Sequence, residues 1–149
     1  MTSFAVDTSC MVAAVCSWHE HHEAAAVEIE RRLAARERLV VPAPALVEAY
    51  AVLTRLPPPH RLSPRDAWRL IADNFVEQAA VVALESDGYV EVVRSTAAEE
   101  LAGGRTYDAV IGECARLGRA KTLLTFNRRH FDPPPQGVTV VVPATRRAG

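Results

Sequence analysis

Phe4-Ala5-Val6-Asp7-Thr8-Ser9 opens the chain with a short apolar run that ends at an acidic residue. The run has the length of a buried strand, and Asp7, Thr8 and Ser9 are residue types that cap helices. These six residues therefore predict a strand that passes directly into a helix. A carboxylate at this junction has two explanations, a helix cap or a functional group, and the stretch alone favours neither.

The same alternation of short strand and helix continues along the chain. We expect further strands over residues 39–41, 81–84, 122–125 and 138–142. We expect helices over residues 10–18, 19–36, 45–56, 64–75, 86–101 and 106–117, with Ser63 and Thr106 as caps. Short β-branched strands alternating with helices predict an α/β fold, in which helices cover both faces of a mostly parallel sheet. Because no repeat or linker interrupts the pattern, we predict one domain over residues 1–149.

Composition narrows the class of protein. The 149 residues are 49% hydrophobic and 23% charged, which is typical of a soluble globular protein. The net charge of -1 gives no overall positive field, so binding of nucleic acid would need a local basic patch. Three cysteines without metal-site spacing indicate reduced thiols. We see no signal peptide or membrane span and expect a cytoplasmic protein.

Three acids fall where ligands bind in parallel sheets, beyond the carboxyl ends of the strands. Asp7 follows the first strand, Glu48 lies about one turn into the helix after the second strand, and Asp108 lies in a first helical turn. Asp108 could simply stabilise that helix end. Glu48 is the only charged residue between Pro42 and Arg55. A carboxylate on an apolar helix must pair, coordinate a metal or protonate, so we interpret Glu48 as functional rather than as a satisfied core acid.

Carboxylate ligands without Cys or His suit Mg²⁺ or, as a substitute, Mn²⁺. Such a cation polarises a phosphoryl oxygen and activates water as the nucleophile near neutral pH. The acids have no nucleophilic Ser or Cys paired with a base beside them. The cluster therefore points to phosphoryl chemistry.

Four segments resemble the motifs of PIN-domain nucleases in the same order. They are Phe4-Ala5-Val6-Asp7-Thr8-Ser9, Val41-Pro42-Ala43-Pro44-Ala45-Leu46-Val47-Glu48, Gly104-Arg105-Thr106-Tyr107-Asp108-Ala109-Val110-Ile111 and Leu124-Thr125-Phe126-Asn127-Arg128-Arg129-His130-Phe131. Their order and the chain length resemble the VapC toxins of type II toxin–antitoxin pairs over essentially the whole chain.

This resemblance implies a PIN-like sandwich that cleaves structured RNA in a metal-dependent, endonucleolytic reaction. It implies metal ligands at Asp7, Glu48 and Asp108, with hydroxyl support from Thr8 or Ser9 and from Thr125. It also implies a cognate antitoxin and a homodimer. Many members carry an acid at the fourth motif, whereas this chain has Asn127. Asn127 would complete the catalytic site, and whether one or two cations bind is left open.

Other polar clusters have simpler explanations. His19, His21 and His22 resemble a metal cluster, but we interpret them as a solvated helix start. Arg128 and Arg129 are candidates for binding RNA phosphates, with a solvated turn as an equal alternative. Aromatic residues within apolar helical stretches are expected in the core or a dimer interface rather than as surfaces on which bases stack; they are Trp18, Tyr50, Trp68 and Phe75. The tail Arg146-Arg147 is expected to be a frayed chain end.

Two other functions are compatible with the same residues. A non-catalytic module could keep the fold and bind a partner protein, which the neutral Asn127 allows. A receiver-like phosphoacceptor domain also clusters acids and uses a lysine near a strand, for which Lys121 is a candidate. We favour the ribonuclease, because Asp7 is followed by Thr8-Ser9 rather than by a second acid.

Overall fold

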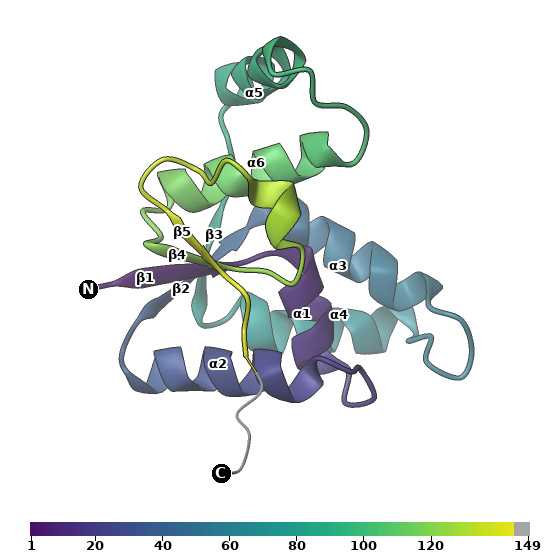
Figure 1. The fold of residues 1–149 in the computed structure, drawn as a ribbon. Helices are drawn as coiled ribbons and strands as arrows, with labels where there is room; N and C mark the ends of the chain where they lie inside the picture. The colour runs from purple at the N-terminus through teal and green to yellow at the C-terminus, as the bar shows by residue number, and fades with distance from the viewer. Residues whose placement is uncertain (145–149) are drawn as a thin grey trace.

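The computed structural model describes residues 1–144 and contains a five-stranded sheet between layers of helices (Figure 1). The strands are β1 (Ser3–Val6), β2 (Arg38–Pro42), β3 (Ala79–Val82), β4 (Thr122–Leu124) and β5 (Thr139–Val141). The helices are α1 (Thr8–Val15), α2 (His22–Ala34), α3 (Ala43–Arg55), α4 (Pro64–Phe75), α5 (Ser86–Ala98), α6 (Arg105–Leu117) and the 3-10 helix η1 (Arg128–Phe131). In the view of Figure 1, α5 and α6 lie above the sheet and α1, α2 and α4 below it.

All paired strands run parallel, in the order β3-β2-β1-β4-β5, which confirms the predicted α/β fold. The chain builds the sheet outward from β1 in one direction and then returns to β4 on the other side. The strand order therefore reverses between β1 and β4, the position where open sheets of this kind place their ligand sites. Val6 pairs with Leu124 there, so the residues that follow them, Asp7 and Thr125, lie next to each other.

The core is built mainly from the central strands and from the helix faces that cover them. Phe4, Val6 and Val40 are at most 1% exposed, as expected for strands covered on both faces. Helix α3 buries Ala45, Ala49 and Leu53 at four-residue spacing, and it leaves Val47, Glu48 and Tyr50 exposed. This packing fixes the direction in which α3 presents Glu48.

Several predicted boundaries differ from the structure for local reasons. Helix α1 begins at Thr8, two residues earlier than expected, because Asp7 caps it. Helix α2 begins only at His22, so the predicted helical start at His19 is wrong. Ser63 is confirmed as a cap and accepts a hydrogen bond from the Asp66 backbone N–H. Thr106 is not the cap of α6, because that helix already begins at Arg105 after Gly104.

The three cysteines of the chain, Cys10, Cys16 and Cys114, are buried and form no disulfide bond in the structure. Within residues 1–144, the structure contains no helix with the length and hydrophobicity needed to cross a bilayer. The tail Arg146-Arg147 lies outside the described residues.

We predict that Gly118, at the end of α6, is required for the packing of this helix on the sheet. A Cβ atom added there would lie 2.6 Å from Cγ1 of the buried Val40 and 3.3 Å from Cγ2 of Val82. Gly118→Ala should therefore lower the free energy of unfolding by about 1–3 kcal/mol, measured by urea denaturation. Gly104→Ala is the control, because no atom lies within 4 Å of its Cβ position, and it should change stability by less than about 0.5 kcal/mol. Equal effects of the two substitutions would contradict this view of the packing.

Candidate active site

Asp7 is the most enclosed acid of the site and is only 3% exposed. Its Oδ1 accepts hydrogen bonds from the Ser9 hydroxyl (2.7 Å) and from the Cys10 backbone N–H (3.0 Å). Its Oδ2 accepts one from the Thr125 hydroxyl (2.5 Å). The bond from Cys10 makes Asp7 the N-cap of α1, while the bond from Thr125 ties it to the end of β4. Asp7 is therefore a helix cap and also a fixed carboxylate at the switch point of the sheet.

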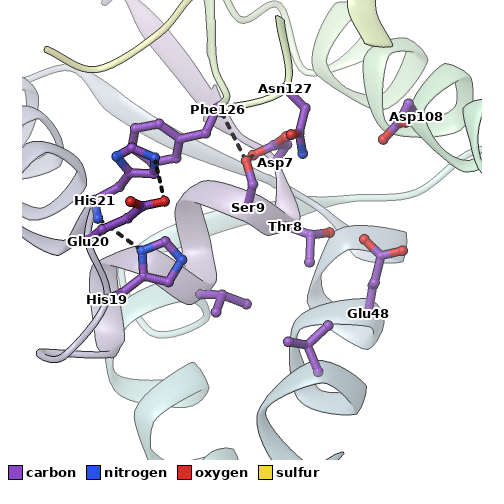
Figure 2. Close-up of a pocket in the computed structure, with 12 residues that line it drawn as sticks. Asp7, Thr8, Ser9, His19, Glu20, His21, Glu48, Asp108, Phe126 and Asn127 are labelled. Atoms are coloured by element: carbon purple, nitrogen blue, oxygen red, sulfur yellow. Dashed lines mark hydrogen bonds and ion pairs between the residues drawn. The ribbon is translucent and has the colours of Figure 1, made fainter. Parts of the chain in front are cut away.

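A second layer of hydrogen bonds extends from Asp7 into the loop after β4. The Asn127 backbone N–H donates to the Thr125 hydroxyl (2.8 Å), and the Phe126 backbone N–H donates to the Ser9 hydroxyl (3.0 Å). Ser9 and Thr125 thus each connect this loop to the Asp7 carboxylate. The network holds Asn127 beside Asp7, as Figure 2 shows.

The predicted metal ligands and Asn127 meet at one open cleft of about 430 Å³ (Figure 2). Asp7 lies at the end of β1, Glu48 on α3, Asp108 on α6 and Asn127 after β4. The remaining residues that line the cleft are Thr8, Ser9, Val12, His19, Glu20, His21, Val52 and Phe126. Segments from distant parts of the chain therefore bring the three predicted carboxylates and an amide to one place, together with the carboxylate of Glu20.

Asp108 has a partner that the sequence interpretation missed. Oδ2 of Asp108 lies 3.0 Å from Nδ1 of His130, which η1 supplies. Burial raises the pKa of Asp108, the charge of His130 lowers it, and the nearby charge of Glu48 raises it again. His130 lies within the fourth motif, and the sequence analysis assigned it no role, because nothing in the sequence places η1 against α6.

Burial raises the pKa of Asp7 above the ordinary value of an aspartate, since the charged form loses its hydration. The three hydrogen bonds from Ser9, Thr125 and Cys10 act in the opposite direction, and the charge of Asp108 adds a further increase. The carboxylates of the cleft therefore repel one another in the absence of a positive charge. A cation between them would remove this repulsion.

The donor atoms of the cleft fit a hard cation. Carboxylate, amide and hydroxyl oxygens are the ligands that Mg²⁺ and Mn²⁺ prefer. The buried Oγ1 of Thr8 has no hydrogen-bond partner in the described part of the chain, although such atoms are nearly always satisfied. Thr8 lies between Asp7 and Glu48 in Figure 2. Within residues 1–144, however, no three acidic, His or Cys side chains already stand at ligand distances, so binding would require the side chains to rotate inward.

Two sequence arguments about the cleft were wrong. Glu48 was interpreted as a carboxylate on an apolar helix, but it is exposed, because α3 turns its Ala45 and Ala49 side to the core and leaves Glu48 on its open side. His19 and His21 were interpreted as a solvated helix start, but they lie in the loop before α2 and line the cleft. Trp18 was expected in the core or a dimer interface; it is 46% exposed, so it does not lie in the core.

Arginines gather beside the acidic cleft. A second pocket of about 510 Å³ is lined by Arg105, Phe126, Asn127, Arg128, Arg129 and His130. It shares Phe126 and Asn127 with the acidic cleft, so the two pockets adjoin. Arg105 also donates to the backbone oxygen of Asp132 (3.3 Å) and thereby holds the end of η1. A positive surface therefore lies next to the carboxylates.

Lys121 does not lie at the cleft. It precedes β4 and its backbone N–H donates to the carbonyl of Ser3, at the start of β1. Asp7 follows the carboxyl end of β1, so Lys121 and Asp7 lie at opposite ends of the strands. This position removes the feature that favoured a receiver-like phosphoacceptor.

Comparison with known proteins identifies the family. Residues 4–133 match the PIN domain. Ribonuclease VapC40 of Mycobacterium tuberculosis is 40% identical over 119 residues, covering 80% of this chain and 83% of that protein. Ribonuclease VapC27 of the same organism is 38% identical over 141 residues, covering 94% of this chain and 96% of that protein.

Solved structures share the fold at lower identity. VapC20 of M. tuberculosis, described as a sarcin-ricin loop cleaving toxin, superposes with a TM-score of 0.70 at 18% identity, covering 92% of this chain and 99% of that one. VapBC2 of Rickettsia felis, bound to a DNA fragment from its promoter, gives a TM-score of 0.67 at 17% identity, covering 95% and 98%. These structures show the shared fold. The family match and the relatives of about 40% identity show that the chain belongs to the PIN-domain family and, within it, to the VapC ribonucleases.

Proposed function

We propose that this chain is a Mg²⁺-dependent endoribonuclease, with Mn²⁺ as a possible substitute, and the toxin of a toxin–antitoxin pair. The supporting observation is the convergence of Asp7, Glu48, Asp108 and Asn127 on one cleft at the switch point of the sheet. The substrate class that follows from the family resemblance is structured RNA. We further propose that residues 1–149 act as one nuclease domain and work in the cytoplasm.

Asp7, Glu48 and Asp108 are the proposed metal ligands. A bound Mg²⁺ supplies Lewis-acid activation of the phosphodiester and of the attacking water. Asp7 is already fixed by its hydrogen bonds, whereas Glu48 is exposed and free to turn. Asp108 would exchange its contact with His130 for the cation, and His130 would hold Asp108 ready beside the cleft.

The other residues have positioning roles in this proposal. Thr8 offers an unpartnered hydroxyl to the cation or to the attacking water, and Ser9 and Thr125 hold Asp7 in place. The Asn127 amide orients a water or binds weakly, and it adds no charge for a second cation. Arg128 and Arg129 would bind phosphates of the RNA backbone beside the cleft, since guanidinium groups pair well with phosphate oxygens.

We also propose that a cognate antitoxin binds an apolar groove between α3 and α4. Leu46, Val47, Tyr50, Trp68 and Ile71 line this groove of about 230 Å³. Trp68 is 55% exposed, which is unusual for so large an apolar side chain unless a partner covers it. Val47 precedes Glu48 on α3, so a segment bound here would lie close to the cleft. A homodimer is proposed as well, and the molar mass from light scattering tests it.

Cleavage should depend on a divalent cation and on the carboxylates of the cleft. With Mg²⁺, the protein should cut RNA within the chain, and EDTA should abolish the reaction without any need for Zn²⁺. Glu48→Gln and Asp108→Asn should each lower the cleavage rate by about 100-fold or more, because each removes a charged ligand. Asp73→Asn, on the exposed face of α4, is the matched control and should retain the wild-type rate. Cleavage that persists after exhaustive chelation would contradict the proposal. Absence of cleavage under all conditions would favour a non-catalytic binding module.

Replacing the charge of Asp7 should separate a ligand role from a structural one. Because the pKa of Asp7 is raised in the folded state, its ionisation costs stability as the pH rises from the unfolded value of 3.8 through the folded value. In EDTA near neutral pH, Asp7→Asn should therefore melt at the same temperature as the wild type or higher, with the difference disappearing below pH 3.8. Mg²⁺ should raise the melting temperature of the wild type only. A large loss of stability in EDTA would show that the carboxylate is needed mainly as a helix cap.

The antitoxin groove can be tested by co-purification with any small DNA-binding protein that is encoded directly upstream of this chain. Trp68→Asp should abolish capture of that protein, because a charge would enter the apolar groove. Tyr89→Asp, at an exposed position on α5, should retain capture. Equal capture by both variants would place the interface elsewhere.

A further inference from the structure

A row of aromatic rings leads away from the candidate active site. His21 stacks on Phe126 with ring centroids 4.4 Å apart and planes inclined by 12°. His19 follows at 5.7 Å from His21, and Trp18 at 5.8 Å from His19. Trp18 then stacks on His60 at 4.1 Å. We call these five residues the ring row; it begins beside Asn127 and reaches the loop that joins α3 to α4.

The segment that carries most of the ring row is held by specific hydrogen bonds. The His21 backbone N–H donates to Nδ1 of His19 (3.0 Å), and the His22 backbone N–H donates to the His19 carbonyl (3.0 Å). The ring of His22 bonds to the carbonyl of Ala13 and so fastens the start of α2 to α1. The rings are thus positioned before any ligand binds, which lowers the entropy cost of binding.

The ring row is accessible from the cleft. His19, His21 and Phe126 line the same cavity as the carboxylates, and Figure 2 shows the rings on the side of the cleft opposite Glu48 and Asp108. Farther out, Trp18 remains 46% exposed although His60 covers part of it. An extended ligand could therefore contact the acids and several rings together.

The charges of the cleft favour bases rather than phosphates at the ring row. None of the described residues that line the cleft is Lys or Arg, and Glu20 stands among the rings with its side chain 82% exposed. His19 accepts a hydrogen bond at Nδ1, and burial lowers its pKa, so its ring is neutral at neutral pH. The positive groups lie in the adjoining pocket with Arg128 and Arg129. A strand in the cleft would therefore turn its phosphates toward the arginines and its bases toward the rings.

We propose that the ring row is a stacking surface for unpaired bases of the RNA that flank the cleaved phosphodiester. Proteins that bind single strands commonly stack successive bases on aromatic side chains. The proposal rests on the ribonuclease function proposed above and assigns to the ring row the bases that lie beside the cleaved bond. A base-paired segment is a poor ligand, because its bases already stack on one another.

Binding in EDTA tests the ring row without cleavage. The probes are a short fluorescein-labelled single-stranded RNA of mixed sequence and the same strand annealed to its complement, followed by fluorescence anisotropy. The wild type should bind the single strand more tightly than the duplex. Trp18→Ala and His21→Ala should each weaken single-strand binding by about tenfold and leave duplex binding unchanged. Tyr89→Ala removes an exposed aromatic ring from α5, outside the ring row, and is the matched control.

Conservative replacements separate stacking from charge and from loss of loop structure. Trp18→Phe and His21→Phe should restore single-strand binding, whereas His21→Lys should not. Abasic sites in the RNA should weaken binding to the wild type but weaken binding to Trp18→Ala much less. Wild-type affinity of both alanine variants, or full restoration by lysine, would overturn the proposal.

Cleavage in Mg²⁺ distinguishes failure of this inference from failure of the ribonuclease function. If both hold, Trp18→Ala and His21→Ala should lower kcat/KM for RNA with an unpaired segment. If the wild type cleaves and both variants match its kcat/KM, the ring row is not a substrate surface although the ribonuclease function stands. If the wild type cleaves no RNA, the ribonuclease function fails, and the inference about its substrate fails with it.

Discussion

The carboxylate of Asp7 is enclosed at the junction of β1, α1 and β4, and it accepts a hydrogen bond from Ser9, Cys10 and Thr125. An ionised group at this depth is tolerated only when such donors surround it, so the geometry of the junction is narrowly defined. The bond from Cys10 starts α1, and the bond from Thr125 fixes the loop that carries Asn127. The position of the cleft therefore follows from one satisfied, buried charge.

The surroundings of this charge divide into three chemically different surfaces. Carboxylates from α3 and α6 face Asp7, arginines of η1 form the adjoining pocket, and the ring row extends from Phe126. These surfaces correspond to the three parts of an RNA ligand: the reacting phosphate with its cation, the flanking backbone and the bases. The net charge of -1 conceals this arrangement, because acids and arginines cancel in the sum while remaining separate in space.

Local patterns in the sequence predicted the α/β architecture, most element boundaries to within about two residues, and three of the acids that line the cleft. Asp7 was recognisable because it ends an apolar strand, and the strand–helix alternation predicted a parallel sheet. His130 was missed as the partner of Asp108 because that contact joins η1 to α6, which only the folded packing defines. The histidines before α2 were misjudged because their polar, helix-compatible sequence conceals a hydrogen-bonded loop. Glu48 was singled out because its sequence neighbours are apolar, which suggested that it is buried. It is exposed, because exposure depends on which side of α3 faces the core and not on the adjacent residues.

The central claim is that Asp7, Glu48 and Asp108 together hold a hard cation. Mn²⁺ soaked into crystals of the wild-type protein gives an anomalous diffraction signal that locates this cation directly. The claim predicts a Mn²⁺ peak in the cleft in contact with these carboxylates, with Asp108 turned away from His130. A second peak near Asn127 would show a two-cation site. A single peak would show that the site with the neutral Asn127 amide holds one cation. No peak in the cleft, at a Mn²⁺ concentration that supports cleavage in solution, would contradict the claim.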